Sequence, residues 1–459
     1  MTAHRLLVSS AAGTDWARAP QPVRRRVVDL VADVVAVAGL ASTRPELLAL
    51  AATVGRDVPV GPATVVGSER GWPAATAAFL NGCAVAADQL QDGHRPARGH
   101  PAAHVVVAAL AYAESWDASD TEFLSAVLAG YEVGTRIGRM MGGTPPGVHD
   151  IGTWGQVAAS AALARLLAPG DIDVMSRALD LSAAAVLLTD ARTVFAGRTG
   201  SHLFLGSSVQ QGVSAALAAV AGLVPEPGAV RRHLAAVAAA QWSELEVGCD
   251  PSGWTRYEVL DGYVKVHPTC AHLHGVNDAI DELLADGIDA DAVTEVEVRV
   301  FAGAAQFAEV AQNELAARFS VPTSVAIALA TGRLDESTVT DEVVTSARVR
   351  ALADRVRVVH DPQLDAGYPA GRPARVSVTL TDGSVRTRAT GRPRWDADRA
   401  PDPAELAAKS ERLLRHRFGG GAAAILEAVH RLGDGGSVRQ LGRLLRAGAG
   451  SATGGVATQ

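Results

Sequence analysis

Apolar residues recur every three or four positions through the first 240 residues, which is the spacing of one buried face of an α-helix. The segment RRRVVDLVADVVAVAGL, which starts at Arg24, shows this spacing first. Asp117 and Ser119 precede another such segment, and Asp171 precedes a third; these residue types favour helix starts. The pattern predicts further helices at 44–54, 73–87, 101–116, 121–141, 154–168, 173–190, 207–222 and 229–240.

The periodicity changes near residue 290, where apolar and polar residues begin to alternate. AVTEVEVRVF alternates strictly, which predicts a half-buried strand at 293–301. ARVSVTLTDGSVRTRAT holds two alternating runs around Thr381-Asp382-Gly383-Ser384, which predicts a β-hairpin. SVPTSVAIALATG has helical spacing, and VRALADRVRVVHD is typical of a helix that leads into a strand. This part of the chain is therefore predicted to be a mixed α+β unit.

Helical spacing returns after Pro401-Asp402-Pro403, in AELAAKSERLLRHRF and AAAILEAVHRLG. The whole pattern predicts a mainly α fold, in which a smaller α+β lid is inserted into a large all-helical domain. The expected parts are the first part of the helical domain at 1–267, the lid at 268–400, and the returning helices at 401–446. Residues 447–459 are rich in Gly, Ser and Thr and are expected to form a disordered tail.

Composition narrows the class of protein. Apolar residues make up 48% of the 459 residues, which is enough for a large core. The net charge of -7, with basic and acidic residues interspersed, argues against a nucleic-acid surface. Three widely spaced cysteines fit reduced thiols in the cytoplasm, and no run approaches the ~20 apolar residues of a membrane span. We therefore expect a cytoplasmic protein whose partners include neither nucleic acid nor a membrane.

Polar residues that could act in catalysis or binding are concentrated in four loops. These are DGHRPARGHP, GVHDIGTWG, GRTGSHLFLGSS and KVHPTCAHLHG, which together contain seven of the 13 histidines. Each loop enters a helix, where free backbone N–H groups favour anions. Histidine suits proton transfer because its pKa lies near neutrality. Taken singly, a loop histidine is more often a surface or helix-capping residue, but the clustering favours an acid–base site that binds an anion.

Other kinds of site fit the sequence less well. Cys270, His272 and His274 are close in sequence, but zinc sites usually pair two clusters of CxxC or HxxxH type, so no metal is expected. GGTPPG lacks the GxxxxGK[ST] pattern of a phosphate-binding loop. The GxSxG turn of a serine hydrolase is also missing from the sequence.

Six segments, in order along residues 26–415, together resemble the MmgE/PrpD family. They are NGCAVAADQLQDGHRPARGHPAA, LAGYEVGTRI, GVHDIGTWGQVAASAALARLL, LFLGSSVQQGVSAALAAVAGL, KVHPTCAHLHGVNDAID and AARFSVPTSVAIALATG. The family includes 2-methylcitrate dehydratase, cis-aconitate decarboxylase and iminodisuccinate epimerase. The resemblance implies a helical domain with an inserted α+β lid, and a homodimer.

The resemblance and the loop chemistry together indicate the site residues. The expected catalytic residues are Asp92, His100, His149 and His274, with His100 and His149 as the proton-transfer pair. The expected substrate-binding residues are His94, Arg95, Arg98, Ser201, His202 and Lys265.

The sequence departs from the family pattern at several of these positions. Gln91 stands where an acid is usual, His267 replaces a tyrosine, and Thr323 replaces an aromatic residue. Ser201 stands where a lysine is common, and the adjacent His202 is the candidate to hold the anion instead. Because a fixed cation is lost, a tricarboxylate is not the expected substrate.

These residues predict a cofactor-independent lyase of dehydratase type, which removes a proton next to the carboxylate of a small hydroxy-acid. A decarboxylase or an epimerase of the same family would use the same residues. A diverged binding protein with the same fold is the alternative outside enzymes. An enzyme is expected to keep His100, His149 and His274 together in one cleft, whereas a binding protein is not.

Overall fold

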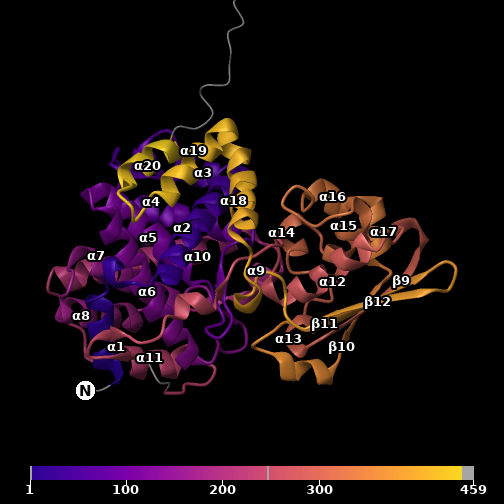
Figure 1. Ribbon diagram of the computed structural model, residues 1–459, viewed down its shortest axis with the longest axis horizontal. Helices are drawn as coiled ribbons and strands as arrows, with labels where there is room; N and C mark the ends of the chain where they lie inside the picture. The colour runs from indigo at the N-terminus through magenta and orange to yellow at the C-terminus, as the bar shows by residue number, and fades with distance from the viewer. Residues whose placement is uncertain (1–2, 245–247, 447–459) are drawn as a thin grey trace, which may run out of the picture.

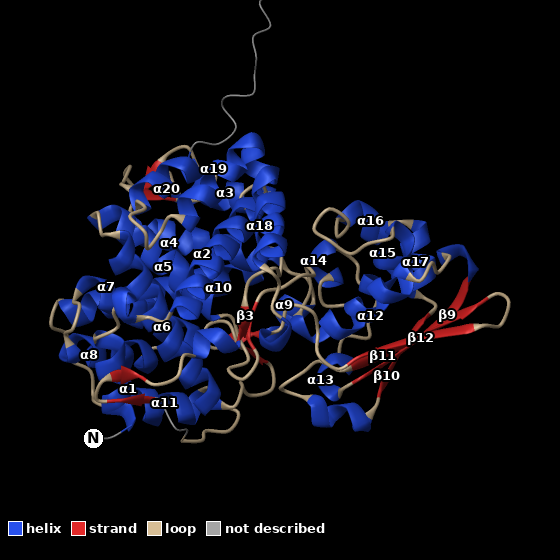
Figure 2. Ribbon diagram, viewed as in Figure 1, coloured by secondary structure: helices blue, strands red, loops and turns tan. Residues whose placement is uncertain are grey.

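The computed structural model describes residues 3–244 and 248–446, which form a larger helical body and a smaller α+β body (Figure 1). Each body has its own buried hydrophobic core. The predicted tail at 447–459 lies outside the described residues. Within the described part of the chain, the mainly α fold with a smaller α+β domain is confirmed (Figure 2).

The helical body combines segments from both ends of the chain. Its helices are α1 (Ala3–Ala12), α2 (Gln21–Ala41), α3 (Pro45–Val54), α4 (Ala74–Ala87), α5 (Pro101–Trp116), α6 (Asp120–Met141), α7 (Trp154–Leu167), α8 (Ile172–Ala184), α9 (Ala191–Phe195), α10 (His202–Val220), α11 (Ala229–Val237), α18 (Pro403–Phe418), α19 (Ala422–His430) and α20 (Val438–Arg446). The returning α18 packs on α2, where Lys409 and Asp33 form a buried ion pair at 2.5 Å.

Small residues let the central helices approach closely. A Cβ atom at Gly134 of α6 would lie 2.4 Å from the Cβ atom of Ala158 on α7. A Cβ atom at Gly212 of α10 would lie 2.3 Å from the carbonyl oxygen of Gln156, also on α7. No real Cβ atom is tolerated at such distances, so the abundance of glycine and alanine in the sequence reflects tight helix packing.

The smaller body is a four-stranded sheet with helices packed on it. Its strands are β9 (Val293–Val300), β10 (Val356–His360), β11 (Ala374–Leu380) and β12 (Val385–Thr390), in the order β10-β9-β11-β12, with only the β9–β10 pair parallel. Its helices are α12 (His274–Ala285), α13 (Ala302–Ala305), α14 (Glu314–Ala317), α15 (Val321–Thr331), α16 (Asp341–Thr345) and α17 (Ala347–Ala353). Val296, Val298 and Val300 of β9 are buried, as the alternating pattern predicts.

Two helix boundaries differ from the sequence prediction by five residues or more. The helix predicted at 173–190 ends at Ala184, because the Gln156 side chain donates to the carbonyl oxygens of Ser182 and Ala185 and redirects the chain. The helix predicted from residue 207 begins at His202. An apolar run, Ala185-Val186-Leu187-Leu188, follows the end of the first helix, so periodicity alone did not place that end.

One helical stretch, Thr199–Val220, is long and apolar enough to cross a membrane by length and composition. It packs against α4, α7 and α8, and half of its most apolar window is buried inside the protein. The stretch is therefore packed against other helices of the same body.

Candidate active site

A cavity of about 80 Å³ lies where the helical body meets the smaller body, and both contribute to its wall. Short strand pairs fix the loops that line it. β3 (Gly93–His94) pairs with β8 (Gly262–Tyr263), and β4 (Val148–His149) pairs with β5 (Thr189–Asp190). Three of the four loops singled out in the sequence therefore converge here, although they are far apart along the chain.

The cavity contains six of the ten predicted site residues. His94, Arg95, Arg98, His100, His149 and Lys265 line it. The other four, Asp92, Ser201, His202 and His274, are not among its lining residues. The expected convergence of His100, His149 and His274 is therefore found for the first two histidines, while His274 packs behind the wall.

The hydrogen bonds of His100 fix which of its ring nitrogens carries the proton. Its Nδ1 lies 2.5 Å from the backbone carbonyl oxygen of Asp92, an acceptor, so Nδ1 must donate. This leaves Nε2 with a free lone pair, 3.8 Å from Oδ2 of Asp150. Burial lowers the pKa of His100 to about 4, so the ring is neutral at neutral pH and Nε2 is free to accept a proton.

His149 has a different environment. Its Nδ1 lies 3.1 Å from Oδ1 of Asp150 and 3.2 Å from the backbone nitrogen of Ile151. The protonated ring can donate to Asp150, and the neutral ring can accept from the N–H group of Ile151. Each protonation state therefore has a partner, which suits a residue that gives up and regains a proton. The ring of Phe195 supports that of His149 at 6.0 Å between centroids.

Cations dominate the rest of the wall. Arg95 is neutralised by Asp396 at 2.7 Å, whereas, within residues 3–244 and 248–446, the hydrogen bonds that Arg98 and Arg372 donate go to backbone carbonyl groups. The guanidinium groups of Arg98 and Arg372 also lie 5.2 and 4.7 Å from the ring centroid of Tyr368. Two positive charges that carboxylate side chains do not neutralise therefore remain at the cavity, a composition that favours an anionic ligand.

Lys265 adds a third cation, and its ammonium group is fully buried. Nζ donates to the carbonyl oxygen of Gln89 at 2.9 Å. Burial lowers the pKa of Lys265 to about 8, so the charge is present at neutral pH but is lost in mild alkali. Lys265, which was predicted to bind a carboxylate, therefore lies at the cavity.

Two predicted residues of the first loop hold the loop itself. The carboxylate of Asp92 accepts from the backbone N–H groups of Ala102 and Ala103, and so caps the first turn of α5. His94 lines the cavity, but its Nδ1 accepts from the N–H group of Ala97 and its Nε2 contacts the carbonyl oxygen of Glu258. Burial raises the pKa of Asp92 to about 7 and lowers that of His94 to about 3. Their geometry indicates structural support for His100 rather than contact with a ligand.

His274 belongs to a buried network inside the smaller body. Its ring meets that of His267 edge to face, at 5.4 Å between centroids. His267 in turn contacts Oδ1 of Asp278 at 2.9 Å through Nε2. Burial lowers the pKa of His274 well below its usual range, which keeps the ring neutral. The histidine of this loop that does line the cavity is His272, two residues earlier.

His202 and Ser201 lie outside the cavity, so the expected replacement of the family lysine is not where it was predicted. His202 starts α10, and its Nε2 is 3.5 Å from a carboxylate oxygen of Glu46. Glu46 in turn lies 3.4 Å from Arg44. His202 therefore contacts an ion-pair network instead of an anion site.

This placement gives a direct test in which His202→Ala is compared with Arg98→Ala. His202→Ala is expected to leave KM for the substrate within about twofold of wild type, because the imidazole does not reach the cavity. Arg98→Ala is expected to raise KM about 10- to 100-fold, the effect of losing a hydrogen bond to a charged group. Steady-state kinetics measures both; a large rise of KM in His202→Ala alone would restore the role expected from the sequence.

Five further residues of the cavity wall were not among those predicted from the sequence. They are Asp150, Tyr263, His272, Tyr368 and Arg372, all of which line the cavity. Asp150 and His272 lie in two of the histidine-rich loops, so the clustering of polar residues in the sequence could have indicated them. Arg372 and Tyr368 come from GYPAGRP, a turn of the smaller body whose sequence has no feature that distinguishes it from other surface turns.

Among the described residues, one group has the spacing of a metal site, formed by His94, Glu258 and Asp261. Arg139 and Arg256 form ion pairs with these same carboxylates. Nε2 of His94 already contacts the carbonyl oxygen of Glu258 at 3.1 Å. The donor set is thus engaged in protein contacts, and two guanidinium groups oppose a cation there.

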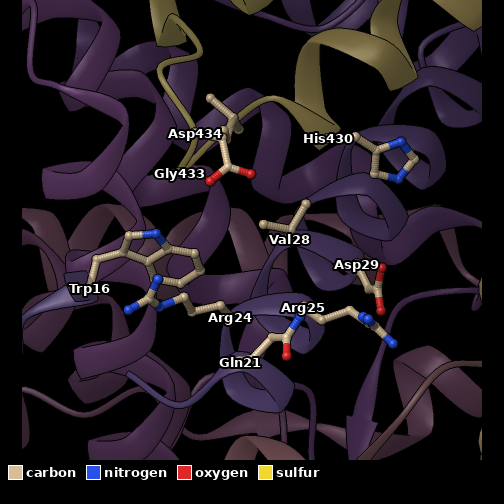
Figure 3. A pocket seen from close by; sticks show the side chains of 10 residues that line it. Trp16, Gln21, Arg24, Arg25, Val28, Asp29, His430, Gly433 and Asp434 are labelled. Atoms are coloured by element: carbon tan, nitrogen blue, oxygen red, sulfur yellow. The ribbon is translucent and has the colours of Figure 1, made fainter. Parts of the chain in front are cut away.

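A larger pocket of about 530 Å³ lies on the outside of the helical body, between α2 and α19 (Figure 3). Arg24 and Arg25 line it together with Asp29, His430 and Asp434. Nε of Arg24 donates to the carbonyl oxygen of Ala19 at 2.8 Å, so this arginine is engaged by the protein. The pocket contains no predicted site residue and has charges of both signs, which distinguishes it from the cavity between the two bodies.

Comparison with known proteins agrees with this architecture. The MmgE/PrpD N-terminal domain model matches residues 5–233, and the MmgE/PrpD C-terminal domain model matches residues 267–434. A cis-aconitate decarboxylase-like protein from Aspergillus oryzae is 32% identical over 158 residues, which cover 32% of this chain and 33% of that protein. The chain thus aligns with about a third of that relative's length. Because the two domain models together match most of the sequence, this protein belongs to the MmgE/PrpD family.

Proposed function

We propose that this protein is a cofactor-independent lyase that removes a proton next to the carboxylate of a small hydroxy-acid and expels the hydroxyl group as water. Family membership supports an activity of dehydratase or decarboxylase type. The observation that carries the proposal is the pairing of His100 and His149 around Asp150, in a cavity lined by uncompensated cations.

His100 is the proposed general base. Its Nδ1 proton is held by the carbonyl oxygen of Asp92, so the free lone pair on Nε2 is available to take a proton from carbon. The negative charge that develops on the substrate carboxylate is stabilised by Arg98, Arg372 and Lys265. Burial lowers the pKa of Arg372 to about 10, which leaves it cationic at neutral pH.

His149 is the proposed general acid. Its protonated ring gives a proton to the leaving hydroxyl group, and the neutral ring that results accepts from the N–H group of Ile151. At the end of the step His100 carries one extra proton and His149 lacks one. The Asp150 carboxylate lies between them, 3.8 Å from Nε2 of His100 and 3.1 Å from Nδ1 of His149, and is placed to return the proton.

The experiment that tests this function is a screen of hydroxy-acids and unsaturated acids by NMR in heavy water. Exchange of a C–H proton next to a carboxylate, followed by loss of water, supports the proposal. Release of carbon dioxide would instead identify a decarboxylase, the second candidate, which the similarity to the Aspergillus oryzae protein favours. A complete lack of both exchange and carbon dioxide release with every acid would contradict both.

The pH dependence of kcat/KM for exchange should be bell-shaped. On the acid side, His100 loses its free lone pair as pH falls through about 4, the value to which burial lowers its pKa. On the alkaline side, Lys265 loses its charge as pH rises through about 8, its lowered pKa. In Lys265→Arg the alkaline fall should move to higher pH, since a guanidinium group stays protonated. An unchanged alkaline limb in Lys265→Arg would show that another group titrates there.

The remaining features of the proposal are those expected of a metabolic enzyme of this family. We propose a homodimer in the cytoplasm that acts on a small carboxylate and uses no metal. The arginines and the lysine at the cavity favour an anion and oppose a divalent cation, which supports the last point.

A further inference from the structure

A second pocket, of about 440 Å³, lies directly beside the candidate active site. Its wall comes from α9 of the helical body and from residues 306–320 of the smaller body, so it also spans the junction of the two bodies. Phe195, Phe307, Val310 and Ala311 give it an apolar lining. Arg192, Arg198 and Glu309 also line it and are exposed to solvent. We call it the outer pocket.

Three phenylalanines separate the outer pocket from the catalytic cavity. Phe195 lies 5.0 Å from Phe307 and 5.5 Å from Phe319, measured between ring centroids. Phe319 lines both spaces. Phe195 also contacts the ring of His149, at 6.0 Å between centroids. A single layer of aromatic side chains therefore lies between the proposed general acid and the outer pocket.

The sizes of the two spaces are complementary. The catalytic cavity, at about 80 Å³, is far smaller than the ~300–1,000 Å³ usual for a small-molecule site. It has room for a carboxylate and the reacting carbon atoms only. The outer pocket has a volume in the usual range, and Phe195, Phe307, Val310 and Ala311 give it an apolar surface that the catalytic cavity lacks.

We propose that the outer pocket is a binding subsite for an apolar chain carried by the acid substrate, and that Phe319 is the residue over which this chain passes. The inference rests on the proposed function, because it places the substrate carboxylate among the cations of the catalytic cavity. It adds a substrate class: an acid with a hydrocarbon chain of several carbons beyond the reacting centre. Burial of that chain against Phe195, Phe307 and Val310 supplies the binding energy.

The test uses straight-chain carboxylates, from acetate to octanoate, as non-reacting ligands, with affinities measured by calorimetry. For the wild-type protein the affinity should rise about fourfold with each buried methylene group until the outer pocket is filled. Ala196→Trp places an indole at the pocket wall, since Ala196 is an exposed residue that lines it. In this variant the increase with chain length should be lost.

Ala221→Trp is the matched control. Ala221 is also an exposed alanine directly after the last residue of a helix, and it is not among the residues that line the outer pocket. It should keep the wild-type increase with chain length. Equal binding of all the carboxylates, or an increase that persists in Ala196→Trp, would overturn the subsite but not the proposed function. If no carboxylate bound at all, the anion site itself, and with it the proposed function, would be wrong.

Discussion

His100→Ala is expected to slow exchange of the substrate C–H proton about 10²- to 10⁴-fold, the usual effect of removing a general base. The expectation follows from the hydrogen bond between Nδ1 and the carbonyl oxygen of Asp92, which leaves Nε2 as a free base beside Asp150. The measurement is the rate of deuterium incorporation in heavy water, with circular dichroism to show that the variant is folded. Near-normal exchange in this variant would move the role of base to another residue.

His149→Ala distinguishes the proposed role of His149 from that of His100. If His149 is the acid, this variant should lose elimination of water while it keeps part of the proton exchange, since the base is still present. His360→Ala serves as a control, because His360 is an exposed residue at the end of β10 in the smaller body and pairs with Asp365. It should behave as the wild type in both reactions. Loss of exchange in His149→Ala, with exchange retained in His100→Ala, would reverse the assignment.

Asp88→Ala is expected to lower the free energy of unfolding by about 3–5 kcal/mol, the cost of leaving buried charges unpaired. The Asp88 carboxylate contacts Arg44 at 2.7 Å and Arg318 at 3.0 Å, and Arg318 is 1% exposed. These two guanidinium groups hold the pKa of Asp88 below its usual range, although burial alone would raise it. Because Arg318 comes from the smaller body, the variant should also weaken the contact between the two bodies. Urea denaturation measures the change.

A surface ion pair provides the control for this prediction. Asp291 contacts Arg348 at 2.9 Å, but both side chains are more than half exposed. Asp291→Ala should therefore change the free energy of unfolding by no more than about 1 kcal/mol. A similar small change in Asp88→Ala would show that the buried arginines find other partners or reach water.

The periodicity of apolar residues was sufficient to predict most of the fold. The alternation in 293–301 corresponds to β9, which ends at Val300, and the hairpin around Asp382 corresponds to β11 and β12. Helix ends were predicted less well, because they depend on contacts with residues distant in sequence. α8 ends where Gln156 of α7 captures its last carbonyl groups. No local pattern contains that information.

The candidate site could be predicted only in part, for a similar reason. Sequence spacing marks a loop that enters a helix, but it does not say towards which side each side chain turns. His272 and His274 are two residues apart, yet the first lines the cavity and the second is buried behind it. Arg372 could not be predicted as a site residue, because it reaches the cavity only when the smaller body packs on the helical body.

The return of α18, α19 and α20 to the helical body has a consequence for the order of assembly during synthesis. Apart from Val194 of α9, the buried core of the smaller body comes from residues 273–378, so all of it has left the ribosome once residue 378 has. The core of the larger body includes Leu441 and Leu445, and cannot close until the last helix is available. The surface of α2 that receives α18 stays uncovered until then. During translation the smaller body can therefore fold before the helical body is complete. This is contrary to the usual order, in which the N-terminal domain folds first.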